Sequence, residues 1–112
     1  MEKLTIKQIV KITNGILISG DENIGIESFS KDTRTIQKGD IYVGIKGESF
    51  DGNKYYKQAF EKGAIACILE KQSVDNQNLN QFPNIILVDD TVKALQDLEM
   101  VLIFLSKNCL KL

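Results

Sequence analysis

One stretch of the chain, residues 31–52, contains most of the side chains that could bind a ligand. It reads KDTRTIQKGDIYVGIKGESFDG, with charged, hydroxyl and glycine residues on both sides of an apolar run at 41–45. Loops at the ends of strands carry outward-pointing backbone N–H groups without partners, and α/β proteins commonly bind ligands there. These residue types therefore predict a site for an anionic or sugar-like ligand.

The same residues also fit an ordinary turn structure. Asp32, Thr33 and Arg34 could form a turn in which the carboxylate accepts backbone N–H bonds and the guanidinium stays in solvent. Gly47 and Gly52 could serve only to provide backbone freedom in a loop. The sequence by itself leaves this alternative open.

Two other functional interpretations of the region are weak. Gly39 and Gly44 have the spacing of a P-loop, but Ile45 and Lys46 stand where Lys followed by Ser or Thr is required, so this chain alone is not expected to hydrolyse ATP. The nearby aromatic residues at 55, 56 and 60 are expected to pack in the core or on a helix face rather than form a stacking platform.

Hydrophobic patterning predicts the elements that position this segment. Thr5 and Gln8 have capping-box spacing, and Asn14 with Gly15 supplies a left-handed stop, which together indicate a helix over 5–14. Apolar and β-branched runs, separated by turn-forming residues, indicate the other elements. These are strands at 16–19, 24–29, 41–45, 64–69 and 85–88, loops at 46–53 and 71–83, a helix from 53 to 63, and the longest helix from 91 to 105. This order predicts an α/β fold with a small mixed sheet flanked by helices.

Length and composition restrict the class of protein. A chain of 112 residues fits one domain, 1–112. Fourteen Lys plus Arg against fifteen Asp plus Glu give a net charge of -1, which argues against nucleic acid as a partner. The chain has no histidine and only two cysteines, which is too few for a zinc site built from Cys and His and excludes most hydrolase active sites. We therefore expect no bound metal. We expect the protein to be located in the cytoplasm, because it has few cysteines, no secretory signal and no apolar run long enough to span a membrane.

The ordered set of motifs resembles the N-terminal domain of the Mur ligases. It comprises residues 32–34, 39–43, 46–48, 50–52, Ala59 and 63–64, and the likeness covers about residues 4–98. Within the family, Gly-Glu-x-Phe-Asp-Gly at 47–52 and Asp-Asp-Thr-x-x-Ala-Leu-Gln-x-Leu at 89–98 favour the ligase type that adds D-alanyl-D-alanine to a UDP-N-acetylmuramoyl tripeptide. The sister ligase, which adds the third residue of the peptide, remains the alternative.

The resemblance implies a domain that binds the UDP end of a UDP-linked muramoyl peptide. The full ligase would use ATP and Mg²⁺ to convert the peptide's terminal carboxylate to an acyl phosphate, which an amine then attacks. ATP and Mg²⁺ would belong to a central domain, and the incoming dipeptide to a C-terminal domain. Since the sequence stops before the expected P-loop, we expect these domains to be absent, and this fragment to hold no cofactor and no catalytic residue.

The resemblance also assigns residues to the substrate. The hydroxyl position of the family's Asp-Ser-Arg motif falls on Thr33, and a backbone contact is expected at Lys31. Asn53 stands where such ligases often have histidine, which puts an imidazole contact in doubt. The charges of Lys31, Arg34 and Lys46 are available for a diphosphate. The expected substrate-binding set is Lys31, Thr33, Arg34, Lys46, Gly47, Glu48, Ser49, Phe50, Gly52 and Asn53.

The C-terminal run at 100–105 is apolar on every side, whereas an exposed helix usually alternates with polar residues. We expect it to pack against the central domain of the same ligase, to pair with a second copy of the chain, or to complete the domain's own core. A rival class follows from this feature: a stand-alone protein-interaction domain whose functional surface is the last helix.

Overall fold

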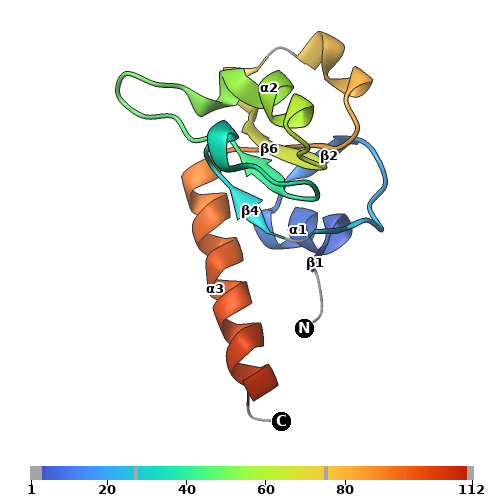
Figure 1. The fold of residues 1–112 in the computed structure, drawn as a ribbon, viewed down its shortest axis with the longest axis vertical. Helices are drawn as coiled ribbons and strands as arrows, with labels where there is room; N and C mark the ends of the chain where they lie inside the picture. Colours follow the sequence, from blue (N-terminus) through green and yellow to red (C-terminus); the bar gives the residue numbers. More distant parts are fainter. Residues whose placement is uncertain (1–3, 27, 75, 111–112) are drawn as a thin grey trace.

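The computed structural model describes residues 4–26, 28–74 and 76–110, and the side chains of residues 76–78 and 105–110 lie outside that description. Its centre is a five-stranded sheet in the order β2-β7-β6-β5-β4 (Figure 1). The strands β4 to β7 run parallel, and β2 is antiparallel to β7 at one edge. Their bounds are Ile16–Ser19 (β2), Phe29–Ser30 (β4), Ile41–Val43 (β5), Ala66–Glu70 (β6) and Ile85–Val88 (β7). The predicted mixed sheet flanked by helices is confirmed.

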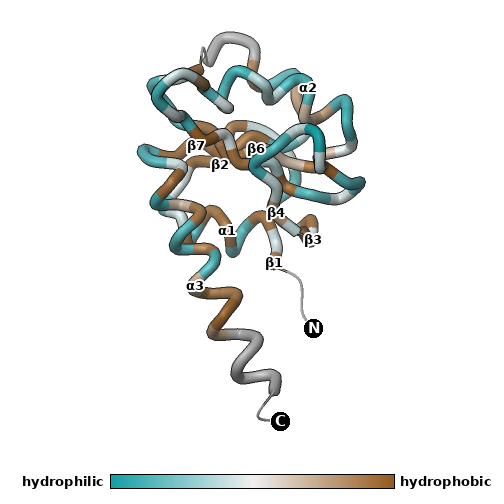
Figure 2. The backbone as a smooth tube through the Cα atoms, turned by 60° about the vertical axis from the view of Figure 1, so that its left-hand side comes forward, coloured by the Kyte–Doolittle hydropathy of each residue, from teal (hydrophilic) through white to brown (hydrophobic). Residues whose placement is uncertain are grey.

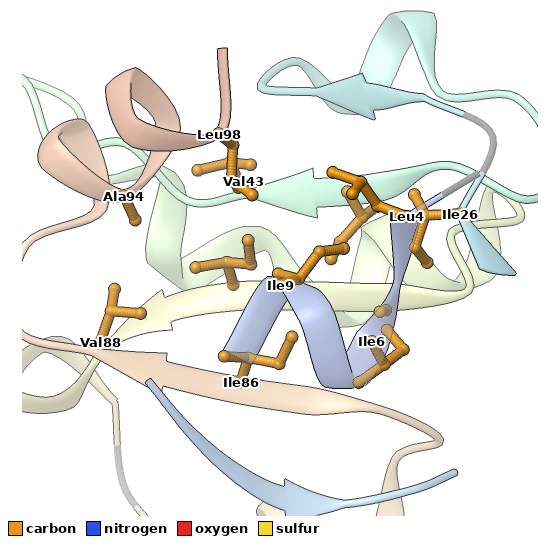
Figure 3. Close-up of a cluster of buried hydrophobic side chains, with 12 residues drawn as sticks. Leu4, Ile6, Ile9, Ile26, Val43, Ile86, Val88, Ala94 and Leu98 are labelled. Atoms are coloured by element: carbon orange, nitrogen blue, oxygen red, sulfur yellow. The ribbon is translucent and has the colours of Figure 1, made fainter. Parts of the chain in front are cut away.

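Each face of the sheet has its own hydrophobic cluster, because successive strand residues point to opposite faces. One cluster joins α1 and α3 to the sheet through side chains that include Ile9, Val43, Ile86 and Leu98 (Figure 3). The other cluster joins α2 to alternate strand residues such as Tyr42. The helix bounds are Ile6–Thr13 (α1), Tyr56–Glu61 (α2) and Thr91–Leu110 (α3).

The first helix forms as its sequence predicts. The Thr5 hydroxyl accepts the Gln8 backbone N–H, and the Gln8 side chain accepts the Thr5 backbone N–H, which completes a capping box. At the other end, Asn14 is the residue with left-handed backbone, at φ 56°. The helix therefore ends at Thr13 because Asn14 tolerates a conformation that most side chains disfavour.

The prediction of one strand over 24–29 is wrong. Two short strands form instead, and residue 27, which lies between them in the sequence, is outside the described residues. They are β3 (Gly25–Ile26), which pairs antiparallel with β1 (Leu4–Thr5) in a separate small sheet, and β4, which pairs parallel with β5. A β-branched run indicates pleated backbone but does not specify which strand it pairs with.

Smaller differences concern the turns. The predicted helix over 53–63 begins as a short 3-10 helix at Gly52–Tyr55, and it is closed by Gly63 at φ 114°. The predicted loop over 71–83 contains two short 3-10 helices, Lys71–Ser73 and Asn76–Gln81. The strand predicted at 64–69 is shifted to the bounds of β6.

The longest helix, α3, extends beyond the sheet at its C-terminal end (Figures 1 and 2). Leu98 is buried in the core and Leu102 packs against it, but Met100, Ile103 and Phe104 are 70%, 56% and 65% exposed. The core of this domain therefore buries only part of the apolar run at 100–105. None of the helices, within the residues described, is long and apolar enough to cross a membrane.

Candidate functional site

The two loops that flank β5 in the sequence lie at the same edge of the sheet. Residues 31–35 follow β4, and residues 44–52 follow β5. Because these strands are parallel neighbours, with Phe29 opposite Ile41 and Ser30 opposite Tyr42, both loops leave at their carboxyl ends. This is the edge at which α/β sheets usually bind ligands.

A pocket of about 430 Å³ opens between these loops, and we call it the β4–β5 pocket. It brings together four of the side chains that the sequence nominated, namely Lys31, Thr33, Arg34 and Phe50. It also contains three that were not nominated: Asp32, Tyr42 and Tyr55.

The first wall of this pocket is a turn closed by Asp32. Its carboxylate accepts the backbone N–H of Arg34 at 2.9 Å and caps the short 3-10 helix Thr33–Thr35. The Arg34 guanidinium donates to the same carboxylate, with Nη2 2.7 Å from Oδ2 and Nε 3.1 Å from each oxygen. The predicted turn is thus present, and it also orients a cation.

These bonds shift the ionisation of both partners. The Arg34 side chain, followed by its backbone N–H, lowers the pKa of Asp32 to about 2, and the Asp32 carboxylate raises the pKa of Arg34. The Arg34 side chain is nevertheless 86% exposed, so it can still reach an anion in the pocket. The Thr33 hydroxyl makes no hydrogen bond to any described residue and remains able to donate and accept.

The opposite wall is aromatic. Phe50 and Tyr55 stack with ring centroids 5.2 Å apart and planes at 14°, and Phe50 is 53% exposed. Tyr42 is buried, donates its hydroxyl to the Gly52 carbonyl at 2.7 Å, and has a pKa raised to about 12, mainly by burial. Tyr55 packs against the core, as expected, but also belongs to this wall.

The loop that carries Phe50 is closed by backbone bonds. The Gly47 N–H donates to the Phe50 carbonyl at 2.6 Å, which forms a turn with Glu48 and Ser49 exposed at its tip. The Gly52 N–H donates to the Ile45 carbonyl at 2.8 Å, and a Cβ at Gly52 would lie 2.8 Å from that oxygen. Glycine at position 52 therefore allows the two arms of the loop to approach closely.

Asn53 anchors the end of this loop to the neighbouring strand. It is fully buried. Its Oδ1 accepts the Glu70 backbone N–H at 2.9 Å, and its Nδ2 donates to Asp51 at 2.9 Å. Gly52 is also buried, so both nominated residues lie behind the pocket wall and hold it in place.

Three of the four remaining nominated residues, Lys46, Gly47 and Glu48, line a separate and more open pocket of about 600 Å³, and the fourth, Ser49, lines neither pocket. We call this more open pocket the acidic pocket, because Lys46 is the one cation among its described lining residues. Its other residues are Glu70, Gln72, Asp89, Asp90 and Val92. Four carboxylates line this pocket with the ammonium of Lys46, and Lys71 pairs with one of them, Nζ lying 3.3 Å from Asp89 Oδ1. The pocket therefore keeps an excess of carboxylates and suits a diphosphate less well than the β4–β5 pocket, which has two cations and one carboxylate.

The part of the chain that the structure describes contains neither a group of metal ligands nor a P-loop. No three Asp, Glu, Cys or His side chains cluster there so as to hold a metal ion. Gly44, Ile45 and Lys46 continue from β5 into a loop rather than into a helix N-terminus.

Comparison with known proteins gives consistent matches. The family model described as Mur ligase family, catalytic domain, matches residues 25–100. A UDP-N-acetylmuramoyl-tripeptide--D-alanyl-D-alanine ligase of Bacillus subtilis is 39% identical over 99 residues, which is 88% of this chain and 21% of the relative. A UDP-N-acetylmuramoyl-L-alanyl-D-glutamate--2,6-diaminopimelate ligase of Clostridium tetani is 34% identical over 92 residues, 82% of this chain and 19% of the relative.

Solved structures agree with these sequence matches. A crystal structure of MurF from Acinetobacter baumannii superposes with a TM-score of 0.70 at 26% identity, covering 88% of this chain and 20% of that one. The chain therefore spans about a fifth of the length of the relatives that it matches.

Proposed function

Because this chain belongs to the Mur ligase family, we propose that it forms the domain that binds the uridine diphosphate end of a UDP-N-acetylmuramoyl peptide in a larger ligase. Such a ligase would act in peptidoglycan precursor synthesis. The observation that carries the proposal is the β4–β5 pocket, whose lining combines three aromatic residues with Thr33 and the two cations Lys31 and Arg34. The domain would bind and orient the substrate, and the bond-forming chemistry would take place elsewhere.

The pocket provides a suitable group for each part of the nucleotide. A uracil ring is flat and carries both hydrogen-bond donors and acceptors. The exposed Phe50 ring, stacked on Tyr55, offers an apolar face for it, and the Thr33 hydroxyl can donate or accept at its edge. Lys31 and Arg34 supply positive charge for the diphosphate.

Arg34 is the better oriented of the two cations. Asp32 holds its guanidinium through both Nε and Nη2, which leaves Nη1 to donate to a phosphate oxygen. Lys31 has a flexible side chain and would contribute mainly as a point charge.

ATP and Mg²⁺ would be bound by a central domain outside this chain, because the residues described here provide neither a P-loop nor a metal-ligand cluster. The same central domain is the partner that we expect for the exposed Met100, Ile103 and Phe104 of α3. A second copy of the chain is the alternative partner for that surface.

For the reaction itself, we propose addition of D-alanyl-D-alanine to the tripeptide substrate. The Bacillus subtilis relative with this name is 39% identical to the chain. Addition of the third residue of the peptide is the second candidate, favoured by the 34% identity to the Clostridium tetani ligase.

Binding of UDP to the 112-residue chain tests the proposal. Amide chemical shifts in ¹H–¹⁵N NMR spectra should change around Thr33 and Phe50 on titration with UDP, and less with ADP at the same concentration. The Thr33→Ala variant should weaken UDP binding roughly fivefold, the effect of losing one neutral hydrogen bond of about 1 kcal/mol. Arg34→Gln should weaken it by roughly tenfold or more, because it removes a charge-assisted bond.

Lys11→Gln is the matched control, since Lys11 is exposed on α1, on the other face of the sheet. It removes the same charge as Arg34→Gln and should leave UDP binding unchanged. Absence of UDP binding, or equal binding by all three variants, would overturn the proposed function.

A further inference from the structure

The loop that carries Phe50 extends from the body of the domain between β5 and α2 (Figure 1). We call residues 46–51 the Phe50 loop. Gly52, which follows this loop, accepts a hydrogen bond from the Tyr42 hydroxyl on β5, with 2.7 Å between Oη and the carbonyl oxygen. We propose that this bond makes Tyr42 a positioning residue, which fixes the Phe50 ring where it stacks on the base of the bound nucleotide. The inference rests on the proposed function.

The backbone bonds of the Phe50 loop join its two arms to each other. Lys46 and Asp51 pair across the loop as an isolated β-bridge. The bonds donated by the Gly47 and Gly52 N–H groups close the same hairpin. These bonds maintain the shape of the loop, but they do not fix its direction relative to the sheet. That direction requires a bond from outside the hairpin, and the Tyr42 hydroxyl supplies one.

The Tyr42 hydroxyl has a well-defined position from which to act. Tyr42 is the central residue of β5, and its buried ring packs in the cluster between the sheet and α2. A close-packed interior leaves such a ring few alternative rotamers. A Cβ at Gly52 would lie 3.1 Å from the Tyr42 hydroxyl, so the hydroxyl packs directly against the backbone of residue 52. Burial raises the pKa of Tyr42 to about 12, and the hydroxyl therefore remains a donor at neutral pH.

Tyr42 also lies between the two walls of the β4–β5 pocket. It lines that pocket together with Phe50, and in the sheet it is opposite Ser30, the residue before the turn that carries the cations. Asn53 anchors the other end of the same segment by accepting the Glu70 backbone N–H of β6. Because this second anchor remains, loss of the Tyr42 hydroxyl alone should displace the Phe50 ring without unfolding the loop.

Tyr42→Phe tests the inference, because it removes the hydroxyl and keeps the ring. The affinity of the folded variant for UDP should fall roughly fivefold, the effect of losing one neutral hydrogen bond. Its affinity for inorganic pyrophosphate should not change, since Lys31 and Arg34 belong to the turn after β4 and not to the Phe50 loop. The NMR signals of the Phe50 ring should shift in the variant before any ligand is added.

A double-mutant cycle shows whether Tyr42 acts through Phe50. In a Phe50→Ala background, Tyr42→Phe should cause no further loss of UDP affinity. Tyr56→Phe is the matched control, because it removes the same hydroxyl from a ring that packs beside Phe82 in the same cluster and lies outside the lining of the β4–β5 pocket. It should leave both the UDP affinity and the signals of the Phe50 ring unchanged.

The outcomes separate this inference from the proposed function. Failure of UDP to bind the unmodified chain would overturn the proposed function and the inference with it. Equal UDP affinity of the unmodified chain and of Tyr42→Phe would overturn the inference alone. An equal loss of affinity for UDP and pyrophosphate would indicate a general structural role and would also overturn it. A loss that persists in the Phe50→Ala background would do the same, because it would indicate direct contact between Tyr42 and the ligand.

Discussion

Replacement of Asn53 by alanine should destabilise the fold by about 3 kcal/mol, because a neutral hydrogen bond contributes about 1 kcal/mol and a bond to a charged group about 2 kcal/mol. The neutral bond runs from the Glu70 backbone N–H to Oδ1, and the charge-assisted bond runs from Nδ2 to the Asp51 carboxylate. Both are lost in Asn53→Ala, and the side chain is fully buried, so bulk water does not replace them directly.

Urea unfolding followed by circular dichroism measures this loss as a lower midpoint at unchanged slope. Lys57→Ala, on the adjacent helix and exposed, is a control that removes a side chain without these bonds. A loss below about 1 kcal/mol for Asn53→Ala would refute the reasoning, since it is less than the value of one buried bond.

The same variant separates anchoring from direct substrate contact. Because Asn53 lies behind the pocket wall, UDP affinity measured where Asn53→Ala is fully folded should change by less than roughly fivefold, the equivalent of one lost hydrogen bond. A larger loss of affinity with normal stability would instead support a contact between Asn53 and the substrate.

Three further predictions concern the loops and the first helix. Gly52→Ala should destabilise the protein by about 1–3 kcal/mol, as overpacking does, because its Cβ would lie 2.8 Å from the Ile45 carbonyl oxygen. The Cβ of Gly47→Ala would meet only the Phe50 carbonyl oxygen, at 3.6 Å, so this variant should lose less stability in urea unfolding. The Asp32 carboxyl should titrate with a pKa of about 2 in ¹³C NMR, and Arg34→Gln should return that pKa towards 3.8. Because the pKa in the folded protein is lower than the model value of 3.8, the stability that this pair contributes is present above pH 3.8 and is lost as the pH falls towards 2. An unchanged Asp32 pKa in Arg34→Gln would contradict the assigned cause. Thr5→Ala should lower stability by about 1 kcal/mol through loss of the capping box, and Thr35→Ala, which lies outside α1, should not affect the amide protection of that helix.

Local patterns predict those elements whose causes are local. The capping residues of α1 are three positions apart, and Gly63 closes α2 through its own backbone angle, so both ends could be predicted from the sequence. The apolar run of β7 gave its strand with the observed bounds, 85–88. A buried parallel strand is apolar throughout, which makes it easy to recognise.

Features that depend on strand pairing could not be predicted in this way. The run at 24–29 divides between two sheets because its halves meet different partners, β1 and β5. The pairing of β4 with β5 also places residues 31–34 beside Phe50, although in the sequence they lie on opposite sides of β5. Local periodicity contains no information about which strands become neighbours.

The candidate site shows the same division. Charge, hydroxyl and glycine content pointed to Lys31, Thr33, Arg34 and Phe50, which the fold brings into one pocket. Tyr42 was missed because it alternates with Ile41 and Val43 within a strand that reads as uniformly buried. Lys46 was grouped with the other cations by residue type, and only the fold reveals that it lies in a pocket of carboxylates.

Contacts between the uracil ring and the aromatic wall test the central claim most directly. Intermolecular NOEs measured on the 112-residue chain with UDP should connect the uracil H5 and H6 protons to the ring protons of Phe50 and Tyr55. Uracil NOEs to residues of the acidic pocket or of α3, with none to Phe50 or Tyr55, would contradict the account.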